Sequence, residues 1–120
     1  MRVMLFLLVA CSLLAPEDTA DPECARTPPL TYENTGEGLM NKHCVGCHSS
    51  LLPEGMREDA PVGVDFDSYA AVLTWAERIE ARATGDTPDM PPGGGPNAAE
   101  IALLTEWLHC EVANDRAQLR

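Results

Sequence analysis

The chain has 120 residues, which is the length of a single domain. Its 19 Asp and Glu residues against 8 Lys and Arg give a formal net charge of −11, which excludes nucleic-acid binding because phosphate contacts need a basic surface. Aromatic residues make up only 5% of the chain, so a domain this short has a modest core of its own and would gain from a large apolar cofactor.

The N-terminus predicts an exported protein. A single basic residue, Arg2, precedes an apolar run over residues 3–14 that is too short to span a bilayer and fits a secretory signal. Within it, Leu8-Val9-Ala10-Cys11 resembles the bacterial lipobox. That resemblance implies a signal peptide over residues 1–10, a lipid on Cys11 and a membrane-anchored protein of the bacterial periplasm.

An ordinary signal cleaved nearer Ala15 or Ala20 is the alternative, and it would leave a soluble periplasmic protein. Residues 11–30 form the expected lipidated N-terminus and tether, because positions 12–30 are rich in Pro, Asp, Glu and Thr and show little periodicity. The folded domain is therefore predicted to cover residues 31–120.

The first helix is predicted over residues 32–42. Gly36 and Gly38 lower its intrinsic propensity, so at least one of them is expected to have a packing role. Met40 is expected in the core of this helix, and His43 on its surface.

The next residues read Cys44-Val45-Gly46-Cys47-His48, the C-x-x-C-H pattern that attaches a c-type haem. Two thiols three positions apart can each add to a haem vinyl group, and the histidine that follows can reach the iron. Zinc is a weaker alternative, because a closed site needs four ligands and usually a second paired motif. The remaining candidates are scattered: Cys24, Cys110, His43 and His109. A thioredoxin-type dithiol would need a βαβ context that this sequence does not suggest.

After an irregular stretch over residues 49–64, apolar residues recur at three- and four-residue steps and predict a middle helix over 67–83. Its wet face is expected to hold Arg78 and Arg82. A last helix is predicted to begin at Asn97, with Glu100 completing a capping box, and to end near residues 110–113. His109 is expected to be exposed on it. No period-two pattern occurs, so the fold class is all-α.

The loop between these two helices contains Met90, with prolines at positions 88, 91 and 92. Proline fixes the backbone φ angle, so this loop can hold a thioether sulfur in place at a small ordering cost. Met90 is therefore the leading candidate for a sixth iron ligand, and Met56 is the weaker alternative.

Taken together, these features resemble the small monohaem class I cytochromes c over residues 32–112. The resemblance implies a cytochrome c-like fold in which three main helices surround one covalent haem c, with His48 and Met90 as axial ligands. It also implies a glycine-to-aromatic contact between the first and last helices, assigned here to Gly38 and Trp107. A lysine collar typical of mitochondrial members is missing, since Lys42 is the only lysine.

In the same family a proline carbonyl often accepts a hydrogen bond from the ligating histidine, and Pro61 is the residue expected to do so. Phe66 and Tyr69 are expected to line the haem pocket. Five cysteines are an odd number for an exported protein. With Cys11 assigned to lipid and the motif pair to haem, Cys24 and Cys110 are predicted to form a disulfide, the alternative being two free thiols.

These residues predict an electron carrier and not an enzyme, because two axial ligands leave the iron no position for a substrate. The expected partners are other redox proteins and, through Cys11, a membrane, and the chain is expected to be a monomer. The high negative charge serves solubility and gives a weak bias toward a basic partner. The alternatives are a haem enzyme or haem sensor with an open sixth site, or a cytochrome subunit of a larger redox complex.

Overall fold

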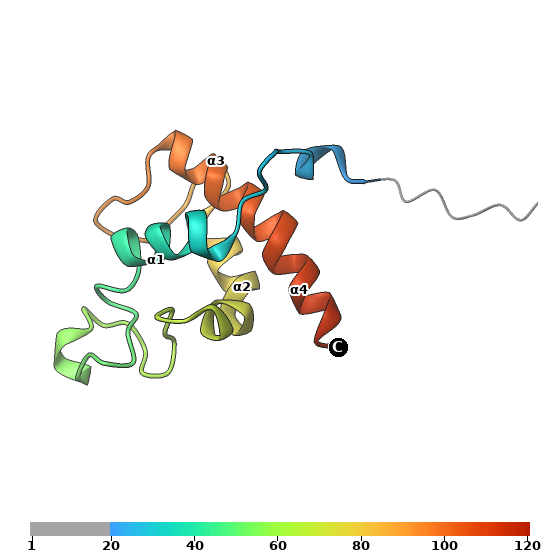
Figure 1. Cartoon of the computed structure of the whole chain (residues 1–120). Helices are drawn as coiled ribbons and strands as arrows, with labels where there is room; N and C mark the ends of the chain where they lie inside the picture. The colour runs from blue at the N-terminus through green and yellow to red at the C-terminus, as the bar shows by residue number, and fades with distance from the viewer. Residues whose placement is uncertain (1–19) are drawn as a thin grey trace, which may run out of the picture.

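The computed structural model describes residues 20–120, so Cys11 and the predicted signal lie outside the described residues. The α-helices are α1 (Glu37–His43), α2 (Tyr69–Ala83), α3 (Ala98–Trp107) and α4 (Ala113–Gln118), and residues 20–120 contain no strand (Figure 1). The prediction that the chain is helical is confirmed.

The first helix begins at Tyr32 and is capped by Thr31, which forms a capping box with Asn34. The Thr31 backbone N–H donates to Asn34 Oδ1 at 2.8 Å, and the Asn34 N–H donates to Thr31 Oγ1 at 3.2 Å. A π-helical turn, Tyr32–Gly36, then leads into α1. Because these bonds satisfy N–H groups that have no partner inside the helix, the helix begins where the sequence predicts.

The middle helix begins two residues later than predicted, at Tyr69, because Ser68 caps it by accepting the Ala71 N–H at 3.2 Å. Its buried side chains recur at helical spacing and form one stripe. They are Val72, Ala76, Ile79 and Ala83.

The last helix is longer than predicted. Asn97 and Glu100 form the expected capping box, but the helix does not end near residues 110–113. It continues from α3 through a π-helical turn, Leu108–Val112, into α4, so that the three follow one another along the chain (Figure 1). Two contacts with α2 hold the extension: Tyr69 donates to Asp115 at 2.7 Å, and Arg116 pairs with Glu77 at 2.9 Å.

The contact between the first and last helices involves Gly36, and the assignment to Gly38 is wrong. An ideal Cβ on Gly36 would lie 2.3 Å from Trp107 Cζ2, whereas nothing lies within 4 Å of a Cβ on Gly38. Trp107 is fully buried. Glu111 strengthens the crossing, because its Oε2 accepts from the Trp107 Nε1–H at 2.6 Å and from the Tyr32 N–H at 2.7 Å.

Gly36→Ala is therefore expected to destabilise the fold by about 2 to 3 kcal/mol, because a buried indole cannot move aside without strain. Gly38→Ala is the matched control and is expected to be neutral or stabilising by up to about 1 kcal/mol, since alanine is the better helix former. Chemical unfolding measures both free energies. Equal effects of the two substitutions would contradict this helix crossing.

The segment that precedes the first helix is not a free tether in its described part. Residues Pro22–Cys24 form a 3-10 turn, and a disulfide joins Cys24 to Cys110 with a Cα–Cα distance of 5.5 Å. Arg26 adds a two-pronged ion pair with Glu106 at 2.6 and 2.8 Å. The domain thus extends toward the N-terminus beyond residue 31 along the last helix. Over residues 20–120, no helix has the length and apolar character to cross a membrane.

Candidate functional site

An apolar cleft of about 250 Å³ lies among α1, α2, α3 and the loops that connect them. Most of its lining is aliphatic, aromatic or proline side chains, and among the lining residues that the structure describes none is acidic. Close-packed protein interiors contain few voids larger than a water molecule. A cleft of this size and polarity therefore favours a bound group with an extended apolar surface.

Both motif cysteines line this cleft at the end of α1. The motif turns tightly, because the Cys47 and His48 N–H groups donate to the Cys44 carbonyl at 3.1 and 2.9 Å. Neither cysteine is in a disulfide. Burial, and to a smaller extent Cys47, raises the pKa of the Cys44 thiol to about 11. This is the opposite of the lowered thiol pKa that a thioredoxin-type dithiol needs.

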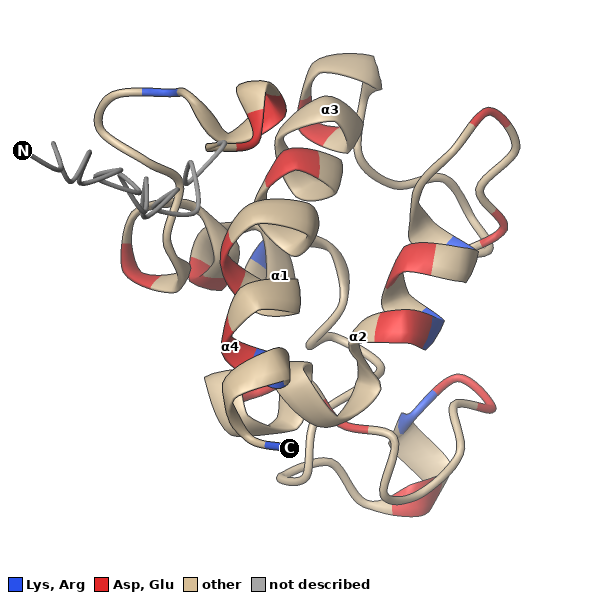
Figure 2. Ribbon diagram, turned by 90° about the vertical axis from the view of Figure 1, so that its right-hand side faces the viewer, with Lys and Arg blue, Asp and Glu red and all other residues tan. Residues whose placement is uncertain are grey.

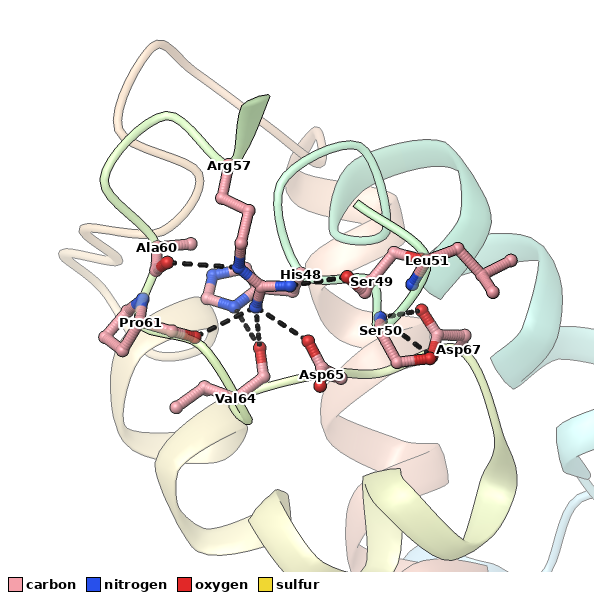
Figure 3. Close-up of polar contacts among 10 residues, drawn as sticks. All are labelled: His48, Ser49, Ser50, Leu51, Arg57, Ala60, Pro61, Val64, Asp65 and Asp67. Carbon is pink, nitrogen blue, oxygen red and sulfur yellow. Dashed lines mark hydrogen bonds and ion pairs between the residues drawn. The ribbon is translucent and has the colours of Figure 1, made fainter. Parts of the chain in front are cut away.

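His48 lies between Phe66 and a backbone carbonyl. Its ring stacks on Phe66 with centroids 4.6 Å apart, and its Nδ1 lies 2.8 Å from the Val64 carbonyl oxygen (Figure 3). A carbonyl can only accept, so Nδ1 carries a hydrogen, and in the neutral imidazole Nε2 is then the nitrogen with the lone pair that can bind a metal. The prediction that the Pro61 carbonyl accepts from His48 is wrong, because that carbonyl accepts from Arg57 at 2.9 Å.

Met90 lines the same cleft, brought there by a loop that is tied to α2. The Asp89 and Met90 N–H groups donate to the Arg82 carbonyl at 3.0 and 2.9 Å, and the Arg82 side chain pairs with Asp89 at 2.6 Å. Met56, the alternative ligand, is 63% exposed and does not line the cleft.

Of the other residues predicted to line the pocket, two do so and one does not. Pro61 and Phe66 line the cleft. Tyr69 does not, because it lies on the side of α2 that faces Tyr32, with ring centroids 5.0 Å apart, and near Trp107. Met40 is buried as expected, and it lines the cleft as well.

Three basic side chains line the cleft, although the sequence predicted them on the surface. They are His43, Arg78 and Arg82. The His43 side chain is only 11% exposed, with Nε2 3.3 Å from Glu100 Oε2. Hydrogen bonds hold the pKa of Glu100 down at about 2, the largest contribution coming from Lys42. Lysine and arginine are few elsewhere on this acidic molecule (Figure 2). The four-residue spacing of Arg78 and Arg82 could have predicted that they lie together, because it puts them on one face of the helix.

The cysteines outside the motif give no support to a zinc site. Among residues 20–120, the one group of His, Cys, Asp and Glu side chains close enough to share an ion is Asp21, Cys24 and His109. Cys24 is held in the disulfide, and His109, which is exposed as expected, bonds to Asp21 at 2.7 Å. The group contains neither Cys44 nor Cys47.

Comparison of the chain with protein-family models, with curated proteins and with solved structures finds no match.

Proposed function

We propose that this protein is a one-electron carrier with a single c-type haem, attached to Cys44 and Cys47 and ligated axially by His48 and Met90. The observation that carries the proposal is that these four side chains, which come from two separate parts of the chain, line one apolar cleft. When bound, the haem iron supplies a one-electron redox couple.

The chemistry of the cleft supports such a group. Two free thiols could attach a porphyrin through its vinyl groups, and the His48 Nε2 with the Met90 thioether would form the axial ligand pair of a six-coordinate c-type haem. Aliphatic and proline side chains suit the faces of a porphyrin, and Arg78 and Arg82 on one side suit its two carboxylates. The Val64 carbonyl fixes the tautomer and orientation of His48.

Electron transfer follows from this ligand set, because two protein ligands leave no position for a substrate on the iron. Ligation by histidine and methionine favours a higher reduction potential than harder ligands give. Backbone hydrogen bonds tie the loop of Met90 to α2, and the Val64 carbonyl holds the His48 ring, so little rearrangement of either ligand would be needed when the iron changes its oxidation state.

Met90→Ala tests the axial assignment. We expect it to abolish the absorption band that arises from sulfur bound to ferric iron, and to let carbon monoxide and cyanide bind. Met56→Ala is the control and should change neither property, because that side chain is largely exposed. Optical titration with each ligand measures the effect. A Met90→Ala protein that keeps the band and excludes carbon monoxide would refute the assignment.

A haem enzyme with an open sixth site is the second candidate, and one observation favours it. Such a site needs a distal histidine or arginine, and His43, Arg78 and Arg82 all line the cleft. The unmodified protein distinguishes the two functions, because only an open site binds carbon monoxide without prior loss of Met90.

The proposal includes export and anchoring by lipid at Cys11, which would keep the carrier at a membrane surface. Several acyl chains on one cysteine give durable attachment, where a single chain gives marginal binding. The domain would then meet membrane-bound or soluble redox partners by diffusion over that surface.

Cys11→Ser is expected to release a soluble protein with an unchanged haem spectrum, because the cleft is built from residues 39–104. Detergent phase partitioning and the mass of the mature N-terminal peptide measure the change. A Cys11→Ser protein that stays on the membrane in high salt would show that something other than lipid anchors it. A mature N-terminus downstream of Cys11 would favour a freely diffusing periplasmic carrier.

A further inference from the structure

Arg57 is a buried cation beside the motif. Its side chain is 2% exposed although arginine is almost never buried without partners. The guanidinium lies within hydrogen-bond distance of five acceptors, which are the carbonyls of Ser49, Ala60, Pro61 and Val64 and the carboxylate of Asp65 (Figure 3). Three of them, Pro61, Val64 and Asp65, share the two hydrogens of Nη2, so one of those hydrogens is bonded to two acceptors. The loop between the motif and α2 is therefore arranged around this one side chain.

Two of these bonds act on His48. The Val64 carbonyl oxygen that accepts from His48 Nδ1 at 2.8 Å also accepts from Arg57 Nη2 at 3.2 Å. Arg57 Nη1 donates to the carbonyl of Ser49, the residue directly after His48. The imidazole and the guanidinium thus share one acceptor, the Val64 carbonyl oxygen. Arg57 also holds the backbone at Ser49, directly after His48.

This sharing affects the electron density of the imidazole. A cation bonded to a carbonyl oxygen draws density from it and weakens it as an acceptor for a second donor. The His48 ring then gives less charge to its Nε2, and a less basic ligand favours the reduced state of a bound iron. The positive charge of Arg57 also favours the reduced state, and because the charge is buried, solvent and salt screen it little. Asp65, with its Oδ1 2.6 Å from Arg57 Nη2, offsets part of this charge.

We propose that Arg57 is a positioning residue that orients His48 through the Val64 carbonyl and raises the reduction potential of the iron bound there, while Asp65 limits the increase. This inference rests on the proposed function. It assigns a role to a residue that neither attaches nor ligates the haem.

The test compares the reduction potentials of Arg57→Gln and Asp65→Asn in the haem-loaded protein by optical redox titration. Arg57→Gln should lower the ratio of reduced to oxidised protein at a fixed ambient potential by about tenfold, which is about 59 mV for one electron. Asp65→Asn should raise the ratio severalfold, because Arg57 then keeps its charge without a counter-charge. Arg116→Gln is the control, since it removes one positive charge on α4, where Arg116 bonds to Glu77, and it should leave the ratio within about twofold at ordinary salt.

The opposite signs separate this role from a purely structural one. Loosening the loop would admit water and lower the potential in both variants, so a shift in the same direction, or none in either, would overturn the proposal. If Arg57→Gln does not fold, Asp65→Asn decides alone, because only the charge argument predicts an increase. A parent protein without covalent haem would contradict the proposed function itself, whereas a haem-bearing parent without opposed shifts contradicts only the role of Arg57.

Discussion

Replacing Cys44 and Cys47 together by alanine is expected to give a protein that loses its haem on extraction with acidified acetone. The reason is that no other free thiol lines the described cleft, since Cys24 and Cys110 are joined to each other. The variant is also expected to fold poorly. The cleft lies at the centre of a small domain and is not filled by protein side chains. The haem would therefore supply a large part of the core of the loaded protein.

The matched control is Cys24→Ala with Cys110→Ala, which removes the same number of sulfur atoms away from the cleft. It should keep the haem through the same extraction. Haem that stays attached when Cys44 and Cys47 are both absent would overturn the covalent assignment, and with it the proposed function.

The control variant is expected to have a large effect of its own, on stability. The disulfide joins residues that are 86 positions apart, and in the chain-entropy model a loop of that length contributes about 4 to 5 kcal/mol by restricting the unfolded chain. It also holds the lead-in segment against the last helix, where Arg26 pairs with Glu106. Cys24→Ala with Cys110→Ala should therefore lower the free energy of unfolding by most of that amount.

Denaturant unfolding of the two proteins without reductant measures this difference. Mass mapping under non-reducing conditions should recover one linked pair of peptides containing Cys24 and Cys110. Two thiols at these positions that can be alkylated in the native parent protein would contradict the bridge.

The sequence predicted the features that depend on local patterns. The helices around 32–42 and 67–83 and the capping box of Asn97 and Glu100 each follow from spacing or from the chemistry of single residues. The pairing of Cys24 with Cys110 followed from elimination. Its geometry could not be predicted, because it depends on how the lead-in segment lies on the last helix.

The features that the sequence did not predict depend on rotation and on loop conformation. Gly36 and Gly38 lie two residues apart, on nearly opposite sides of a helix, and only the packed structure shows which one faces Trp107. The 49–64 loop has no periodicity, so neither the choice of the Val64 carbonyl over Pro61 nor the burial of Arg57 could be predicted. The low exposure of the His43 side chain could not be predicted either, because histidine has no strong preference for the core or the surface.

The measurement that tests the central claim most directly is an optical redox titration of the full-length protein after extraction from the membrane with detergent. We expect one reversible transition with the slope of a single electron. We also expect that the sulfur-to-iron band of the oxidised form disappears on reduction, and that carbon monoxide leaves the reduced spectrum unchanged. A protein that shows no reversible transition, or whose reduced form binds carbon monoxide at once, would contradict a carrier ligated by His48 and Met90.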